Sequence, residues 1–255
     1  MSKDSNFSTY DSVLSLGAWC QVGAAVRTKQ LCCINSPFHH FGIKRWQILL
    51  DILESQFANY WKKENMSIGD VENRFSNTYK DTRPVYKVYC SKYNMLSNHH
   101  FDEIDNTPEE LKTYESFKEK IDLLSEIFLV QCHTYEKVLF ALKILSFPEP
   151  TTINKEDITR LCAVLDSLRQ GKPYDLRISV PKDLYNEVLS WIKEEQLTHI
   201  SIYPWTIEWN EDLTDEEWEW MIGDVKLPDD HYFKLNTEIL GLSEISHEHI
   251  DYLNS

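Results

Sequence analysis

Cys20 is the residue whose type and local setting most favour chemistry. It follows an apolar run, Ser12–Leu16, and then Gly17, and apolar residues at helical spacing come after it. This order predicts a strand, a turn and a helix, with Cys20 at the helix start. The helix dipole and the backbone N–H groups around Gly17, Trp19 and Gln21 would favour a thiolate there and could hold an oxyanion. The alternative is a small buried cysteine that packs in a helix.

Two histidine doublets could supply the base that such a thiol needs. His39-His40 follows Pro37-Phe38, a loop that could contact substrate, and His99-His100 precedes Phe101 in another predicted loop. Exposed loops also collect histidines without any function. Adjacent histidines point apart and no carboxylate completes a known ligand spacing, so we expect no metal. Because the glycines form no phosphate-binding loop, we expect no cofactor.

Composition and charge restrict the possible partners and compartments. The net charge of −15 would repel phosphate backbones, so we expect no nucleic acid and favour a neutral or basic partner. The 6 cysteines show no CxxC spacing, which is typical of free thiols in a reducing compartment. The sequence contains no apparent signal peptide and no run long enough to span a membrane, so we expect a cytoplasmic protein.

Strands and helices alternate along much of the chain. Strands are predicted at residues 85–90, 127–131, 174–180 and 199–203, and helices at 46–57, 107–125, 136–145, from 154 and at 181–195. Residues 62–84 are polar and predicted to be irregular. The alternation predicts an α/β fold with a central, mostly parallel or mixed sheet flanked by helices. We expect a polar tail at residues 1–10 and a single domain over 11–255, rich in Trp and acids from about residue 205.

The segment around Cys20 also resembles a known family. Val13-Leu-Ser-Leu-Gly-Ala-Trp-Cys-Gln21, followed by Val26-Arg27 and Ser36-Pro37-Phe38, is similar to the N-terminal signature of an uncharacterised bacterial family of papain-like cysteine peptidases. That family shows Ser-Leu-Gly-x-x-Cys, a helix, Pro-Phe-Asp-Trp, and later a histidine just before a Phe. Asn98-His99-His100-Phe101 and Phe128-Leu-Val-Gln131 fall in matching order here, so the resemblance covers roughly the first half of the chain.

The resemblance implies a nucleophile and a base. Cys20 would be the nucleophile and His99 the base, with His100 as its nearest rival. It also implies a papain-like α+β fold as the alternative to the α/β fold above. No acid matches the third member of a triad, and Asp102 and Asp224 both remain candidates. The chain departs from the family where His39-His40 replaces Asp-Trp.

Three functions are compatible with these observations. The leading one is a cysteine-dependent hydrolase or acyl-transfer enzyme that acts on a protein, peptide or other amide or ester through Cys20 and a histidine. The second is a non-enzymatic acidic protein that binds and neutralises a basic partner. The third is an α/β transferase that binds a nucleotide or sugar phosphate near Gly17–Cys20, beyond the carboxyl end of the first strand.

Overall fold

The computed structural model describes residues 8–17, 22–23, 26, 29–31, 34–39, 41–43, 45–144, 152–205 and 214–229. Its elements are β1 (Ser8–Thr9), β2 (Ser12–Ser15), β3 (Phe41–Ile43), α2 (Gln47–Glu54), η1 (Lys63–Asn65), β4 (Met66–Phe75), β5 (Thr82–Cys90), β6 (Met95–Ser97), α3 (Tyr114–Thr134), β7 (Val138–Lys143), α4 (Lys155–Arg169), β8 (Tyr174–Pro181), α5 (Lys182–Glu194), β9 (Ile200–Trp205), α6 (Asp215–Trp218), the π-helical turn η2 (Glu219–Gly223) and β10 (Val225–Lys226).

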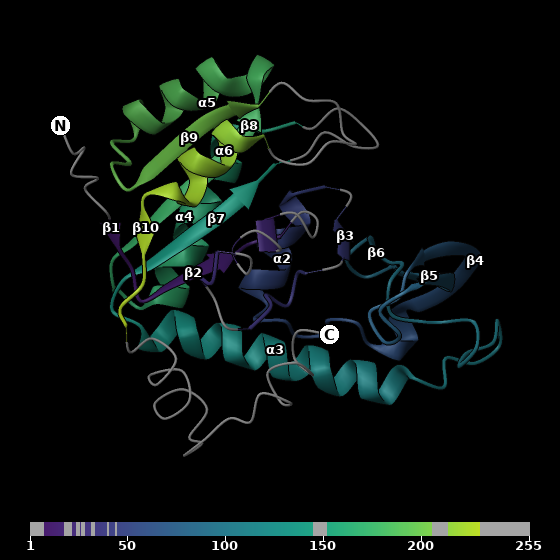
Figure 1. Cartoon of the computed structure of the whole chain (residues 1–255). Helices are drawn as coiled ribbons and strands as arrows, with labels where there is room; N and C mark the ends of the chain where they lie inside the picture. The colour runs from purple at the N-terminus through teal and green to yellow at the C-terminus, as the bar shows by residue number, and fades with distance from the viewer. Residues whose placement is uncertain are drawn as a thin grey trace.

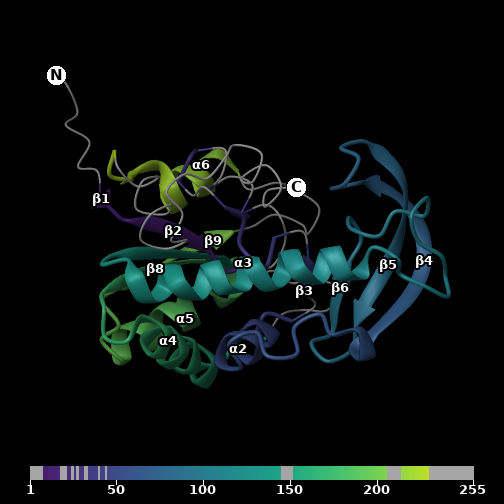
Figure 2. The same cartoon turned by 90° about the horizontal axis from the view of Figure 1, so that it is seen from below.

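A four-stranded parallel sheet forms one half of the structure. Its strand order is β2-β7-β8-β9, and every neighbouring pair is parallel. All residues of β7 are buried, as expected for a parallel strand covered on both faces. Helices α4 and α5 lie on one side of this sheet and α6 on the other (Figure 2). The predicted α/β fold with a mostly parallel sheet is confirmed.

An antiparallel sheet of order β3-β6-β5-β4 forms the other half. It lies beyond the carboxyl ends of the parallel strands (Figure 1). Its long edge strand β4 has no buried residue, which explains why the prediction of an irregular segment at 62–84 is wrong. Only Met66 and Ile68 pack against the core, and both are only partly buried, so most of the strand shows no apolar alternation that a sequence pattern could detect.

Helix α3 runs along both sheets (Figures 1 and 2). The predicted strand at 127–131 is wrong because this apolar run is the last part of α3, and the predicted helix at 136–145 is wrong because β7 lies there. Thr107 and Glu110 form a turn, so the helix begins later than predicted and continues past Ser125. A short apolar run fits a buried helix and a strand equally well.

The region after residue 152 follows the predictions more closely. Asn154 and Asp157 form a capping box that starts α4, and α5 begins directly after Pro181. The strands predicted at 174–180 and 199–203 correspond to β8 and β9. The Thr214 side chain accepts from the N–H of Glu217 and caps α6. No described helix is both long enough and apolar enough to cross a membrane.

The two faces of the parallel sheet are buried in different clusters. Val138, Phe140 and Leu142 of β7 belong to a large core that includes residues of both sheets and of α2 to α5. Leu139 and Ala141 face the other way. They belong to a smaller core with the helical residues Val22 and Val26 and with Met221 and Ile222 of η2.

Candidate active site

The predicted nucleophile lies in a short segment whose two ends can be placed. Cys20, Trp19 and Gln21 lie outside the described residues, whereas Gly17, Val22 and Gly23 are described. Gly17 follows the end of β2 and has φ +83°, a conformation that favours glycine. Its N–H donates to the Ser15 hydroxyl at 3.3 Å. The predicted strand and turn before Cys20 are therefore confirmed.

Both ends of this segment contact the turn formed by residues 36–39. A Cβ added to Gly17 would lie 2.5 Å from the Cβ of Phe38, so the backbone there passes directly over the phenylalanine. A Cβ added to Gly23 would lie 3.2 Å from Cε1 of His39 and closer still to Nδ1. Gly17 and Gly23, on either side of the segment that contains Cys20, thus lie close to Phe38 and His39.

The 36–39 turn is held in place from three sides. The Ser36 hydroxyl donates to the Ser15 carbonyl at 2.6 Å, which ties the turn to β2. The Tyr60 hydroxyl donates to the Pro37 carbonyl at 2.9 Å. Phe38 is fully buried and contacts the rings of Phe57, Tyr60 and Phe128. The loop that we predicted could contact substrate is therefore rigidly anchored at Pro37 and Phe38, while His40 lies outside the described residues.

The second histidine doublet follows β6. Strand β3, which comes directly after the 36–39 turn, pairs with β6 in the register Phe41 to Ser97. The ring of His100 stacks on that of Phe41, with the ring centres 5.1 Å apart, and its centre lies 5.2 Å from that of Phe117 of α3. This strand pairing brings His99 and His100 close to the 36–39 turn, which is far from them in sequence.

The two histidines differ in their hydrogen bonds. His100 Nδ1 lies 2.8 Å from the Ser97 hydroxyl, and its Nε2 lies 3.1 Å from the amide nitrogen of Asn77. His99 Nδ1 lies 2.8 Å from the Phe75 carbonyl oxygen. Because a carbonyl only accepts, His99 carries a proton on Nδ1 and Nε2 is the basic nitrogen of its neutral ring.

Burial and neighbouring cations keep both rings neutral. Burial lowers the pKa of His99 below its ordinary value of 6.5. Burial also lowers the pKa of His100 well below that value, and the charges of Lys120, His99, His39 and Lys80 add to the effect. A neutral imidazole is the form that accepts a proton from a thiol.

Asn77 is a contact of the site that the sequence does not reveal. It lies in the turn between β4 and β5, inside the segment predicted to be irregular, and reaches His100 Nε2. Its N–H donates to the His99 carbonyl at 2.9 Å, so the same residue holds the backbone and one ring of the doublet.

The two candidate acids lie elsewhere. Asp102 is 1% exposed; burial raises the pKa of its carboxyl group, and hydrogen bonds with Ser76 and Thr78 oppose this effect. Asp224 forms an ion pair with Arg177 at 2.6 Å. Among the described residues, no hydrogen bond joins either carboxylate to His99 or His100.

Metal binding receives no support from the described residues. Across the described ranges, no three His, Cys, Asp or Glu side chains are arranged to hold a metal ion. The described cysteines Cys90, Cys132 and Cys162 are free and buried.

The comparisons with known proteins identify a family. No curated protein and no solved structure matches the chain. A family model matches residues 11–178, about two thirds of the 255-residue chain, and this range contains the Cys20 segment, the 36–39 turn and both histidine doublets. The chain belongs to the family described as "putative papain-like cysteine peptidase (DUF1796)".

Proposed function

We propose that the protein is a cysteine-dependent hydrolase or acyl transferase of the papain-like peptidase type. Cys20 is its nucleophile and His99 its general base, and it acts on an amide or ester in a peptide or protein. Family membership supports the reaction class. The structure supports the pairing of a Cys20 segment with the histidine doublet.

One observation carries the proposal. Gly23, three residues after Cys20, contacts His39, and β3, which follows His39 closely, pairs with β6 just before His99 and His100. These contacts support a proximity of Cys20 and His99, which are about 80 positions apart in sequence. Such convergence of a nucleophile segment and a base is what nucleophilic catalysis requires.

His99 is the better base of the two histidines. Its Nδ1–H bond to the Phe75 carbonyl fixes the tautomer, so the basic lone pair of the neutral ring is on Nε2, the atom that would take the thiol proton. Both ring nitrogens of His100 contact Ser97 and Asn77, so we assign His100 a positioning role in the same turn.

The reaction follows from these assignments. His99 Nε2 takes the proton of the Cys20 thiol, and the thiolate attacks the carbonyl carbon to form a C–S bond. Backbone N–H groups of the segment from Gly17 to Gln21, which includes Trp19, hold the oxyanion. When the tetrahedral intermediate collapses, protonated His99 gives its proton to the leaving amine or alcohol. Water or another acceptor, deprotonated by His99, then cleaves the thioester and the Cys20 thiol regains its proton.

The charge of the chain bears on the substrate. At a net charge of −15, long-range electrostatics favour a neutral or basic peptide over an acidic one, and disfavour nucleic acid. The acid of a triad stays open: Asp102 is close in sequence to His99 but bonds to the 76–78 turn.

Selective alkylation tests the proposal. Burial raises the pKa of Cys132 to about 12 and that of Cys162 to about 11, and it also raises the pKa of Cys90. At pH 7 the first two are thiolate in roughly one molecule in 10⁵ and one in 10⁴. An activated thiol at a helix start has a pKa of about 3.5–7.5, so iodoacetamide at neutral pH should label Cys20 at least about a thousandfold faster than Cys132 or Cys162, and also faster than Cys90.

Activity-based controls complete the test. Cys20→Ser should abolish hydrolysis of a peptide or ester library, and His99→Gln should reduce it by about 10²–10⁴. The effect of His100→Gln should be smaller. Uniform slow labelling of all thiols, or full activity of Cys20→Ser, would contradict the proposal. Salt-sensitive binding of a basic protein without turnover would then favour a binding protein.

A further inference from the structure

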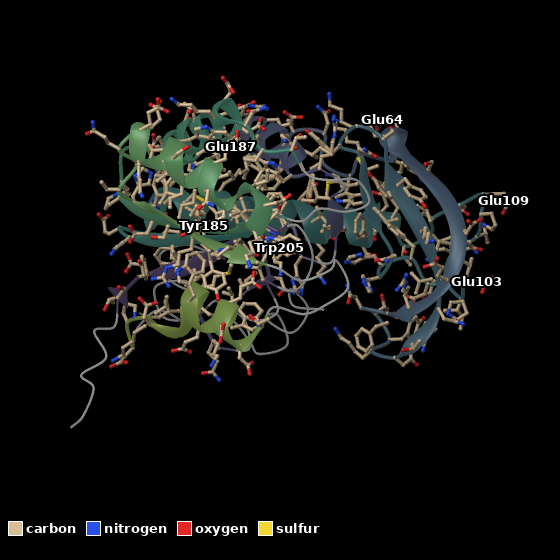
Figure 3. The ribbon with its side chains drawn as sticks, turned by 90° about the horizontal axis from the view of Figure 1, so that it is seen from above. Glu64, Glu103, Glu109, Tyr185, Glu187 and Trp205 are labelled. Carbon is tan, nitrogen blue, oxygen red and sulfur yellow. The ribbon has the colours of Figure 1, made fainter. Side chains whose placement is uncertain are left out.

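A buried ion pair lies at the carboxyl end of the parallel sheet. Lys143, the last residue of β7, contacts Glu217 of α6 at 3.2 Å, and their side chains are 4% and 1% exposed. The Ser179 hydroxyl donates to the other oxygen of Glu217, and the Lys143 ammonium lies 5.1 Å from the ring centre of Trp205. Figure 3 shows Trp205 near the middle of the molecule, away from the rims marked by Glu187 and Glu109.

Stability alone does not explain this pair. Removing two charges from water often costs more than their attraction returns, so a well-packed apolar pair would serve a purely structural role as well. Met221 and Ile222 already anchor the same region through buried apolar contacts. A buried charge beside a candidate site is more informative about function.

Strand register places Lys143 beside the start of the Cys20 segment. In the β2–β7 pair, Ser15 is opposite Ala141, and the Leu16 N–H donates to the Ala141 carbonyl at 2.9 Å. Two residues further along each parallel strand come Gly17 and Lys143. The lysine is therefore level with the turn that leads to Cys20.

Side-chain alternation places Lys143 on the same face as the helical residues after Cys20. Leu139, Ala141 and Lys143 point to one side of β7. The first two pack with Val22 and Val26 in the smaller core. Both ends of the segment 18–21 thus border the row of side chains that ends in Lys143.

We propose that Lys143 is a positioning residue whose ammonium group, fixed by Glu217, Ser179 and Trp205, stabilises the Cys20 thiolate. The inference rests on the proposed function. A cation close to a cysteine favours the thiolate, and in a chain of net charge −15 the long-range field does the opposite. Two other charged pairs lie on this face: Lys137 with Asp175, and Asp224 with Arg177, whose guanidinium also donates to the Trp220 and Met221 carbonyls.

Removing the positive charge of Lys143 and removing the negative charge of Glu217 should shift the pKa of Cys20 in opposite directions. Alkylation of Cys20 in the full chain is followed by mass spectrometry from about pH 5 to about pH 9, which gives its apparent pKa. Lys143→Met should raise this pKa by about one unit or more, which slows alkylation roughly tenfold at neutral pH. Glu217→Gln leaves the Lys143 ammonium without its counter-charge and should lower the pKa of Cys20. A purely structural role would not produce opposite shifts.

Matched variants keep the test decisive. Lys155→Met removes a lysine that pairs with Glu194 at 3.1 Å on the surface, and it should leave the Cys20 pKa unchanged. If Lys143→Met does not fold, the double variant Lys143→Met/Glu217→Gln has no unpaired buried charge and should still raise the pKa. If Cys20 is reactive but its pKa is the same in Lys143→Met, Glu217→Gln and the double variant, the role of Lys143 alone is overturned. A wild-type Cys20 no faster than the other thiols overturns the proposed function, and the role of Lys143 with it.

Discussion

The close approach of Gly23 to His39 offers a direct perturbation of the site. In Gly23→Ala the new Cβ would lie 3.2 Å from Cε1 of His39 and closer to Nδ1. Carbon atoms pack at about 3.5–4.0 Å, so the imidazole would have to move by roughly 0.5 Å or more. Since His39 is 5% exposed, the ring has little room to do so.

Two opposing effects set the change in the free energy of unfolding. Alanine is better than glycine in a helix by about 0.5–1 kcal/mol. Overpacking a buried site costs about 1–3 kcal/mol. The second effect is larger, so Gly23→Ala should destabilise the protein by up to about 2.5 kcal/mol. In a His39→Ala background the clash is absent, and the same change should stabilise by about 0.5–1 kcal/mol.

Urea unfolding of the four proteins measures this double-mutant cycle, and Cys20 alkylation is followed in parallel. Displacing the segment by about 1 Å can cost about 10²-fold in rate, so Gly23→Ala should slow alkylation and His39→Ala should partly restore it. Gly171→Ala is the control. It also adds a Cβ to a glycine, here with φ +85°, but no atom lies within 4 Å of the added Cβ. An equal effect of Gly23→Ala in both backgrounds would refute the reasoning.

Three further predictions concern stability and pH. Arg169 is fully buried and donates to several backbone carbonyls, so Arg169→Met should cost about 3–5 kcal/mol in urea unfolding, whereas Arg160→Met, in a surface ion pair, should cost under about 1 kcal/mol. Asn154→Ala removes the α4 capping box and should cost about 1 kcal/mol in the same assay. An NMR titration of His99 should show a midpoint below 6.5. Because its unfolded form binds the proton more readily, this group should reduce stability as the pH falls through 6.5.

Local sequence signals are sufficient to predict an element where nearby residues fix its start or its end. The capping residue Asn154 and the position of Pro181 predict helix starts that the structure confirms. The turn at Gly17 is predicted for a similar reason, because an apolar run ends there at a residue that tolerates positive φ. In these places the physical cause lies within a few residues.

Predictions failed where tertiary contacts decide. The run 127–131 is helical because it continues the spacing of Ile121 and Leu124 on the buried side of α3, although its composition fits a strand. The long strand β4 has no fully buried residue, so its sequence pattern carries little signal. Neither outcome follows from local propensity.

The sequence was sufficient to select candidate residues of the site, but it did not predict how they are arranged in space. Cys20 and His99 can be picked out by chemistry, whereas the convergence that we propose for them depends on the pairing of β3 with β6. Asn77 and Lys143 give no sequence signal at all. Asn77 is one amide in a polar segment, and Lys143 ends a strand that was predicted to be a helix.

The family match ends at residue 178, inside β8, yet the surroundings of Lys143 extend beyond it. Ser179, Trp205 and Glu217 all follow that point and all contact or adjoin the lysine. Under the proposed function, the nucleophile and base therefore come from the matched region, while the residues after 178 hold the charge beside them. The matched region would then determine the reaction class, and the later segment would set the pH at which Cys20 becomes reactive. Changes at Glu217 should consequently shift the pH dependence of the reaction without altering which bond is cleaved.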